Sequence, residues 1–123
     1  MTDLNQATAM PIDPDDAFKA VSNSRRRQVL LSLAQADGSL SVSELAREIA
    51  ALENLVDPSE VTSDQRTTVY VALIQSHLGM LDDIGVIDYD ERGKRIEPTG
   101  ATTPVAGHIR EITSACYEPG GSE

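Results

Sequence analysis

The chain has 123 residues with one Phe, three Tyr and no Trp, so it can hold one modest domain whose aliphatic core favours helices over a β-sandwich. Its 20 acidic and 10 basic residues give a net charge of −10, an excess that repels itself in the folded state and is screened by high salt. The single Cys116 excludes a disulfide framework and a cysteine-based metal site, and no apolar run approaches the ~20 residues of a membrane-spanning helix.

Three helices are predicted for the first half of the chain, over residues 14–21, 25–37 and 40–52. Asp13 can cap the first of them, and Pro14 suits the first helical position. Residues 22–24 separate this helix from the second, which Gly38 ends. Ser41 and Glu44 have the spacing of a capping box at the start of the third helix.

Apolar residues recur at helical spacing in these segments and predict their buried faces. They are Ala17, Phe18 and Val21 in the first helix, Val29, Leu30, Leu33 and Ala34 in the second, and Val42, Leu45, Ala46, Ile49 and Leu52 in the third. We expect these residues to form most of the core.

A polar connection over residues 54–63 leads to a fourth predicted helix over 64–84. Its stretch TTVYVALI is rich in β-branched residues and is also compatible with a strand. Capping residues precede it, Ile74, Leu78 and Leu81 repeat at spacings of 4 and 3, and Gly85 follows it. These features favour a helix.

The last third of the chain predicts a hairpin and one more helix. Two strands over residues 86–90 and 95–99 flank the turn ERGK. Thr103 can then cap a helix that starts at Pro104 and runs to residue 117.

The predicted fold is therefore mainly α with a small antiparallel β-hairpin, a winged helix-turn-helix plus a C-terminal helix. We expect a disordered acidic N-terminal arm over residues 1–13, the winged helix-turn-helix domain over 14–100, a C-terminal dimerisation helix over 101–117 and a flexible tail over 118–123. The N-terminus has neither the basic start nor the long apolar run of a signal peptide, so a cytoplasmic protein is expected. Abundant acids with only two lysines are typical of the cytosol of an extreme halophile.

Several stretches resemble the winged-helix transcriptional regulators of the ArsR type. NSRRRQVLLSL is similar to their DPTRLRILRLL helix, LSVSELAREI to the first helix of their DNA-binding motif, and IQSHLGMLDDIGVIDYDERGKRIEPT to VSHHLKVLREAGLVEYRREGRRVYYRL. More narrowly, residues 15–100 resemble a winged-helix family of extreme halophiles without an assigned function. The resemblance implies a winged-helix fold and DNA binding. It does not imply metal sensing, because no cysteine lies in the third or fourth helix.

In such a fold the fourth helix enters the major groove and the hairpin tip lies along the DNA backbone. The residues expected to contact DNA are Gln65, Arg66, Thr67, Thr68, Tyr70 and Gln75 on the helix, and Arg92, Lys94 and Arg95 at the hairpin. Gln can bond adenine and Arg can bond guanine, each through two hydrogen bonds, and Thr can contact base or phosphate. The alternative for the hairpin is an ordinary solvated turn, because residues 88–97 hold four acids against these three bases.

Other polar residues are expected to be structural or exposed. Arg25, Arg26 and Arg27 spread around their helix and cannot all face one partner; Arg26 is expected to lie on the core, while Arg25 or Arg27 could contact DNA. His77 is expected to be a core histidine, and the Asp82–Asp83 pair to face solvent. The sequence predicts no catalytic site, no metal site and no cofactor, and so no enzyme.

Val105, Ile109, Ile112 and Cys116 recur at spacings of 4, 3 and 4, a narrow apolar row of the kind that pairs helices. They are expected either to form a homodimer or to pack onto their own domain. The expected function is a sequence-specific, DNA-binding transcriptional regulator that binds double-stranded promoter DNA as a winged-helix dimer. The alternative is a winged-helix protein–protein interaction module that no longer binds DNA.

Overall fold

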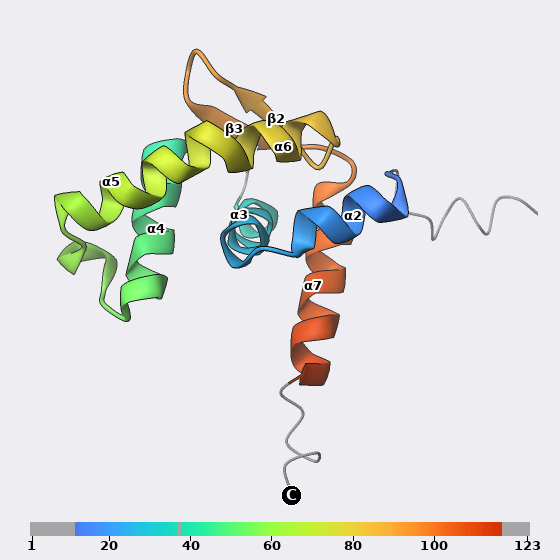
Figure 1. Cartoon of the computed structure of the whole chain (residues 1–123), viewed down its shortest axis with the longest axis horizontal. Coiled ribbons are helices and arrows are strands. Elements are labelled where there is room, and N and C mark those ends of the chain that lie inside the picture. The colour runs from blue at the N-terminus through green and yellow to red at the C-terminus, as the bar shows by residue number, and fades with distance from the viewer. Residues whose placement is uncertain (1–11, 37, 117–123) are drawn as a thin grey trace, which may run out of the picture.

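The computed structural model describes residues 12–36 and 38–116. Most of the expected acidic arm, the whole expected tail 118–123, and the predicted helix-end residues Asp37 and Tyr117 lie outside the described residues. The elements follow the order helix, helix, short strand, helix, 3-10 turn, long helix, hairpin, helix (Figure 1).

The first three helices are α2 (Pro14–Val21), α3 (Ser24–Gln35) and α4 (Val42–Asn54). Asp13 occupies the N-cap position of α2, although its side chain makes no capping hydrogen bond. The Asn23 side chain accepts hydrogen bonds from the first amides of α3, and the Ser41 hydroxyl accepts one from the Glu44 amide of α4. The three helices therefore begin where the local capping chemistry predicts.

The ambiguous stretch TTVYVALI is helical. Residues 63–83 form one helical rod in three parts, α5 (Ser63–Ala72), the π-helical segment η2 (Leu73–His77) and α6 (Leu78–Asp83). A complete capping box between Thr62 and Gln65 opens the rod. Before it, residues Pro58–Glu60 form the short 3-10 helix η1 inside the predicted polar connection.

The hairpin is part of a three-stranded antiparallel sheet in the order β1-β3-β2. Strands β2 (Ile87–Asp90) and β3 (Arg95–Pro98) form the predicted hairpin, and β1 (Leu40–Ser41) pairs with β3. This third strand was not predicted, because two residues are too few to show an alternating pattern. It fixes the hairpin to the start of α4, where the Val42 amide donates to the Lys94 carbonyl at 2.9 Å.

Helix α7 (Thr102–Cys116) packs against α3 and then extends beyond the other elements (Figure 1). It starts one residue before the expected cap Thr103. The buried Thr102 hydroxyl accepts a hydrogen bond from the Thr99 amide at 2.9 Å and donates one to the Val86 carbonyl at 2.6 Å. Thr102 therefore joins the start of α7 to the base of the hairpin.

The aliphatic core lies between α3, α4, the α5–α6 rod, the sheet and the first half of α7. Its largest fully buried side chains are Leu30, Leu33, Leu45, Ile49, Leu73, Leu78, Leu81, Ile87 and Ile96. Two predicted core residues are wrong: Phe18 is 69% exposed and Leu52 is 56% exposed. The buried residues of these helices are Ala17 and Ala20 in α2 and residues between Val42 and Ala51 in α4. No helix within the described ranges has the length and apolarity to cross a membrane.

Candidate nucleic-acid interface

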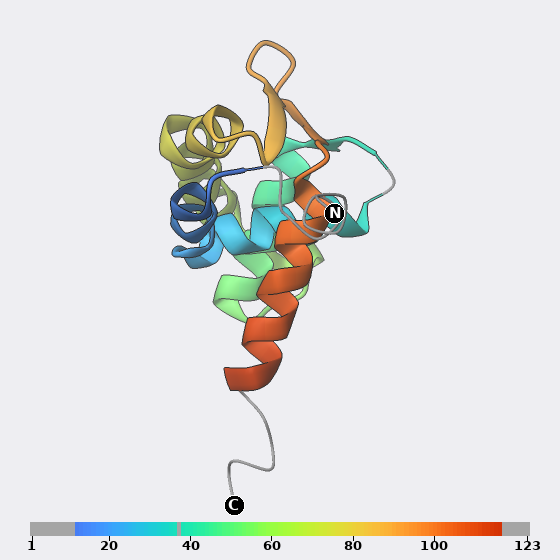
Figure 2. The ribbon, with the colours of Figure 1, turned by 90° about the vertical axis from the view of Figure 1, so that its right-hand side faces the viewer.

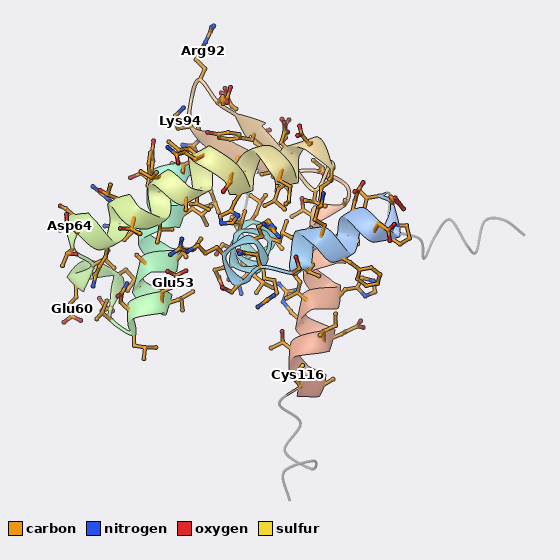
Figure 3. The ribbon with its side chains drawn as sticks, in the orientation of Figure 1. Glu53, Glu60, Asp64, Arg92, Lys94 and Cys116 are labelled. Atoms are coloured by element: carbon orange, nitrogen blue, oxygen red, sulfur yellow. The ribbon has the colours of Figure 1, made fainter. Side chains whose placement is uncertain are left out.

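The α5–α6 rod and the hairpin border one another on the outside of the molecule. Figures 1 and 2, which are 90° apart, both show the hairpin projecting beyond the rod on the side away from α3. Figure 3 places Lys94 on the hairpin, and Arg92 at its tip, pointing away from the molecule, while β2 packs against α6. The two elements expected to face DNA therefore share one side of the fold.

Side chains alternate between the two faces of the hairpin strands, so that one face is directed toward the core. Ile87, Tyr89 and Ile96 face inward, with Ile87 and Ile96 fully buried. The Tyr89 hydroxyl is buried without a hydrogen-bond partner among the described residues, and burial, followed by the charges of Glu91, Tyr70 and Asp90, raises its pKa. Tyr70 of α5 and Tyr89 of the hairpin are both partly buried against the core.

Two of the predicted contact residues at the start of α5 are engaged within the helix. The Gln65 side-chain oxygen accepts a hydrogen bond from the Thr62 amide at 3.0 Å. The Thr68 hydroxyl donates to the Asp64 carbonyl at 2.9 Å. Gln65 keeps its amide donors and one lone pair of its amide oxygen, but the capping box restricts how this side chain can be oriented toward a base.

Three exposed side chains form the outward row of the rod, Thr67, Val71 and Gln75, spaced four residues apart. Thr67 and Gln75 were predicted to contact DNA, whereas Val71 was not. Tyr70, also predicted to contact DNA, is half-buried and packs against the core. A methyl-bearing side chain such as Val71 is suited to contact the methyl group of thymine.

The turn of the hairpin is held by its own polar groups. The Asp90 carboxylate accepts from the amides of Arg92 and Gly93 at 3.1 and 3.2 Å. A Cβ at Gly93 would lie 2.7 Å from Asp90 Oδ2, so a larger residue there would require the Asp90 carboxylate to move. Lys94, with φ 54°, is the residue that adopts the left-handed conformation.

The three basic side chains of the hairpin differ in whether they form hydrogen bonds within the chain. Lys94 Nζ donates to the Glu91 carbonyl at 2.7 Å, and Arg95 donates to the Ser39 hydroxyl through Nε and Nη2. The guanidinium of Arg92 makes no hydrogen bond or ion pair with any residue of the described ranges. Arg92 is therefore the hairpin base best placed to reach a partner.

Several carboxylates lie near the surface expected to face DNA. Asp88 and Glu97 are opposite each other in the register of β2 and β3, and both lie on the face of the sheet opposite to Tyr89 and Ile96. At the start of α5, however, the carboxylates of Glu60 and Asp64 lie beside the expected contact residues (Figure 3). The expected DNA-facing surface is therefore mixed in charge at that end.

The arginine cluster of α3 has a structural role. Arg25 pairs with Glu53 through two hydrogen bonds of 2.7 and 2.8 Å, and this contact raises its pKa. Arg27 donates to the Val21 carbonyl at 2.7 Å. Arg26 donates to the carbonyls of Lys19 and Ala20 at the end of α2. All three guanidinium groups bind within the chain, as expected for Arg26.

His77 ends the π-helical segment and contacts Arg26. The Arg26 Nη1 atom lies 3.3 Å from His77 Nδ1, and since an arginine can only donate, this nitrogen accepts and the ring is neutral. Burial, and then the charges of Arg26 and Arg25, lowers the pKa of His77 below 6.5. The half-buried ring thus joins α3 to the rod as a structural histidine.

The lowered pKa of His77 predicts a loss of stability in acid. The unfolded chain takes up the proton first, so stability falls as pH drops from about 7 through 6.5 and the lower folded-state pKa. His77→Gln keeps an acceptor for Arg26 and removes the titration. Urea unfolding between pH 7 and 5 should show a smaller loss for this variant than for the wild type and for His108→Gln, which alters an exposed histidine. Equal slopes for all three proteins would contradict the expectation.

A polar hollow that the sequence did not predict lies beside the start of α5. It measures about 170 Å³ and is lined by Arg47 of α4, the η1 turn, Thr62, Ser63 and Arg66. Arg47 lies on the exposed face of α4, opposite its buried residues. The helical pattern of the sequence is enough to predict that Arg47 is exposed. Its proximity to Arg66 depends on the path of the intervening loop.

The four expected dimer residues divide into two pairs. Val105 and Ile109 are buried within the chain, so they contribute to its own core. Ile112 is 55% exposed and Cys116 is exposed. Together with Val21, Arg27, Ile109 and Thr113, they line a hollow of about 270 Å³ between α2 and α7. Only the outer half of the predicted row is available to a second copy.

Comparison with known families gives one match. Residues 18–97, about two-thirds of the chain, match a domain of unknown function, DUF7344. The chain belongs to this family. The DUF7344 domain thus spans α2 to β3 and leaves α7 outside the matched region. No curated protein and no solved structure shows significant similarity to the chain.

Proposed function

We propose that this DUF7344 protein is a sequence-specific, DNA-binding transcriptional regulator of the cytoplasm, related in architecture to the ArsR-type winged-helix regulators. The observation that carries the proposal is that the hairpin projects beside the α5–α6 rod, with the Arg92 side chain at its tip pointing away from the molecule (Figure 3). Arg66 at the start of α5 and Arg92 at the hairpin tip make no hydrogen bond or ion pair with the described residues, whereas the arginines of α3 are all engaged.

The proposed binding mode inserts α5 into the major groove. Thr67, Val71 and Gln75 then face base edges, and the hairpin lies along the adjacent backbone with Arg92 and Lys94 near phosphates. Gln75 is the residue of this row with both a donor and an acceptor for adenine. Sequence preference is thus expected from the middle of α5 rather than from its capped first turn.

The net charge of −10 shapes how such a protein binds. Repulsion between its carboxylates and the DNA weakens at high salt, because the Debye length falls to about 3 Å at 1 M. High salt also removes the counterion release that drives ordinary DNA binding. Binding then depends on base contacts, shape and dimerisation more than on charge.

A homodimer is proposed to form through the outer half of α7 and the adjacent face of α2. Ile112 and Cys116 are exposed there, and Phe18 and Val21 lie on neighbouring turns of α2. A two-fold dimer would present two α5 helices to half-sites about 34 Å apart. The proposal leaves Val105 and Ile109 in the core of each subunit.

Ile112→Asp tests the dimer. A charge at this exposed position should leave the fold intact and convert the dimer to a monomer, because an isolated carboxylate in an apolar contact is strongly unfavourable. Sedimentation equilibrium at molar salt measures the change. Thr103→Asp, an exposed position at the other end of α7, is the matched control and should remain dimeric. A wild-type protein that sediments as a monomer contradicts the proposal.

A protein–protein interaction module is the second candidate function. Leu55 is 91% exposed at the end of α4, and Leu52, three residues earlier, is 56% exposed, so this end of α4 offers apolar side chains to a partner. The acidic balance of the chain also suits this function. It requires no contact between α5 and DNA.

Mobility shift of genomic DNA fragments across a salt series separates the two functions. A DNA-binding regulator should retard a subset of fragments, with a preference that persists as salt rises. Retardation of no fragment, even at low salt, would contradict DNA binding and leave the interaction module.

A further inference from the structure

The polar hollow beside α5 has the composition of an anion site. Arg47 and Arg66 reach it from different helices, and the hydroxyls of Ser59, Thr62 and Ser63 complete its polar wall. Because one water takes about 30 Å³ of liquid, a hollow of about 170 Å³ holds a phosphate group with part of its hydration. The hollow is open to solvent on the side of the molecule where α5 begins.

Neither arginine of the hollow has an anionic partner among the described residues. The ion pairs within those residues are Arg25–Glu53 and His108–Glu111. Arg47 and Arg66 are both exposed, and two guanidinium groups around one small hollow repel each other. An anion between them would remove this repulsion.

The nearest acids of η1 are held by their own turn. Asp57 accepts from the Ser59 amide at 3.2 Å and from the Ser59 hydroxyl at 2.6 Å, contacts that lower its pKa. Glu60 accepts from the Asp57 amide at 3.3 Å. These carboxylates are therefore engaged with η1, and neither forms an ion pair with Arg47 or Arg66. The third acid at this end, Asp64 in the first turn of α5, forms no ion pair with either arginine.

The hydroxyl groups differ in what they offer an anion. Ser59 donates its proton to Asp57 and has none left to donate. Thr62 accepts from the Gln65 amide at 3.1 Å and keeps its own proton free. An anion in the hollow can thus receive hydrogen bonds from two guanidinium groups and from Thr62.

We propose that this hollow binds one phosphate group of the DNA backbone, shared between Arg47 and Arg66. The proposal rests on the proposed function, because α5 must lie on DNA for a phosphate to reach the hollow. Planar guanidinium groups suit the tetrahedral oxygens of a phosphate better than an ammonium does. It assigns Arg66 to the backbone instead of to guanine, and adds Arg47 of α4 to the DNA-binding surface.

Arg47→Ala and Arg66→Ala test the assignment when measured on several duplexes over a salt series. Each variant should weaken binding about tenfold at low salt, by the same factor on preferred and unrelated sequences. The double variant should lower the slope of log affinity against log salt by about one, as expected for one lost phosphate contact. Arg110→Ala, an exposed arginine of α7, is the matched control and should change neither quantity.

Three results on DNA would overturn the proposal while leaving DNA binding intact. The first is unchanged affinity in both variants. The second is a loss confined to preferred sequences, which would return Arg66 to base contacts. The third is a slope that falls by about two in the double variant, which would give each arginine its own phosphate.

Inorganic phosphate tests the hollow separately from the proposed function. At constant ionic strength, replacing chloride by phosphate should shift the backbone amide signals of residues 62–66 in the wild type and not in the double variant. If the wild type binds no DNA, the proposed function fails. A shift with phosphate would then reassign the hollow to the free ion, whereas no shift would overturn the anion site itself.

Discussion

Replacing Leu73 by alanine is expected to lower the free energy of unfolding by about 2–5 kcal/mol. Leu73 is fully buried and is the first residue of the π-helical segment, where the rod packs on the core. A rigid rod cannot close the cavity left by three missing carbon atoms, so both the lost burial and the cavity contribute. Urea unfolding at the salt concentration of maximum stability measures the change.

Leu52→Ala is the matched control for this substitution. It removes the same atoms from a leucine that is 56% exposed at the end of α4, so the loss should stay below about 1 kcal/mol. Equal losses for the two variants would mean that the rod does not close the core as described.

Replacing Thr102 by valine is expected to lower the free energy of unfolding by about 1–3 kcal/mol, although the two side chains have nearly the same shape. The variant leaves the Thr99 amide and the Val86 carbonyl without the partner that the Thr102 hydroxyl supplies. An unsatisfied buried polar group carries its full desolvation penalty. The loss should appear in both denaturant and thermal unfolding.

Two further substitutions isolate the hydroxyl. Thr102→Ser keeps both hydrogen bonds and should lose less than Thr102→Val. Thr103→Val alters the exposed neighbour and should change stability by no more than about 0.5 kcal/mol. A Thr102→Val protein as stable as the wild type would show that the hairpin is not fixed to α7 through this residue.

The helices could be predicted because their ends and apolar faces are encoded locally. Ser41 with Glu44, and Asn23 before α3, mark helix starts through side-chain contacts within one turn. The exposure of Phe18 and Leu52 could not be predicted in this way. Each continues an apolar stripe, and its exposure depends on how far the neighbouring elements cover that stripe, which the local sequence does not encode.

Pairing between distant segments also could not be predicted from the sequence. Strand β1 is defined by its hydrogen bonds to β3, more than fifty residues further along the chain. The π-helical segment, similarly, has no signature in a stretch whose apolar residues fit an ordinary helix. Both features arise from tertiary packing.

For the candidate site, the sequence indicates which side chains can contact DNA by their chemistry, but it does not indicate which of them are free to do so. Arg92 and Thr67 lie exposed as expected, but Gln65 caps its own helix and Tyr70 is half-buried. Residue type shows what a side chain can donate or accept, whereas its availability depends on neighbours such as Thr62. Arg47 was missed because its partner in the hollow lies across the loop that contains η1.

In the proposed function, the outer face of α5 and the hairpin together form the surface that binds DNA. Amide chemical-shift mapping locates this surface when the ¹⁵N-labelled protein is titrated with the fragment that it retards most strongly. We expect the chemical-shift changes to concentrate in residues 62–76 and 88–95. The amide signals of α2 and of the outer half of α7 should keep their positions. Unchanged signals in both of those ranges, with shifts at other elements or none at all, would contradict this proposal.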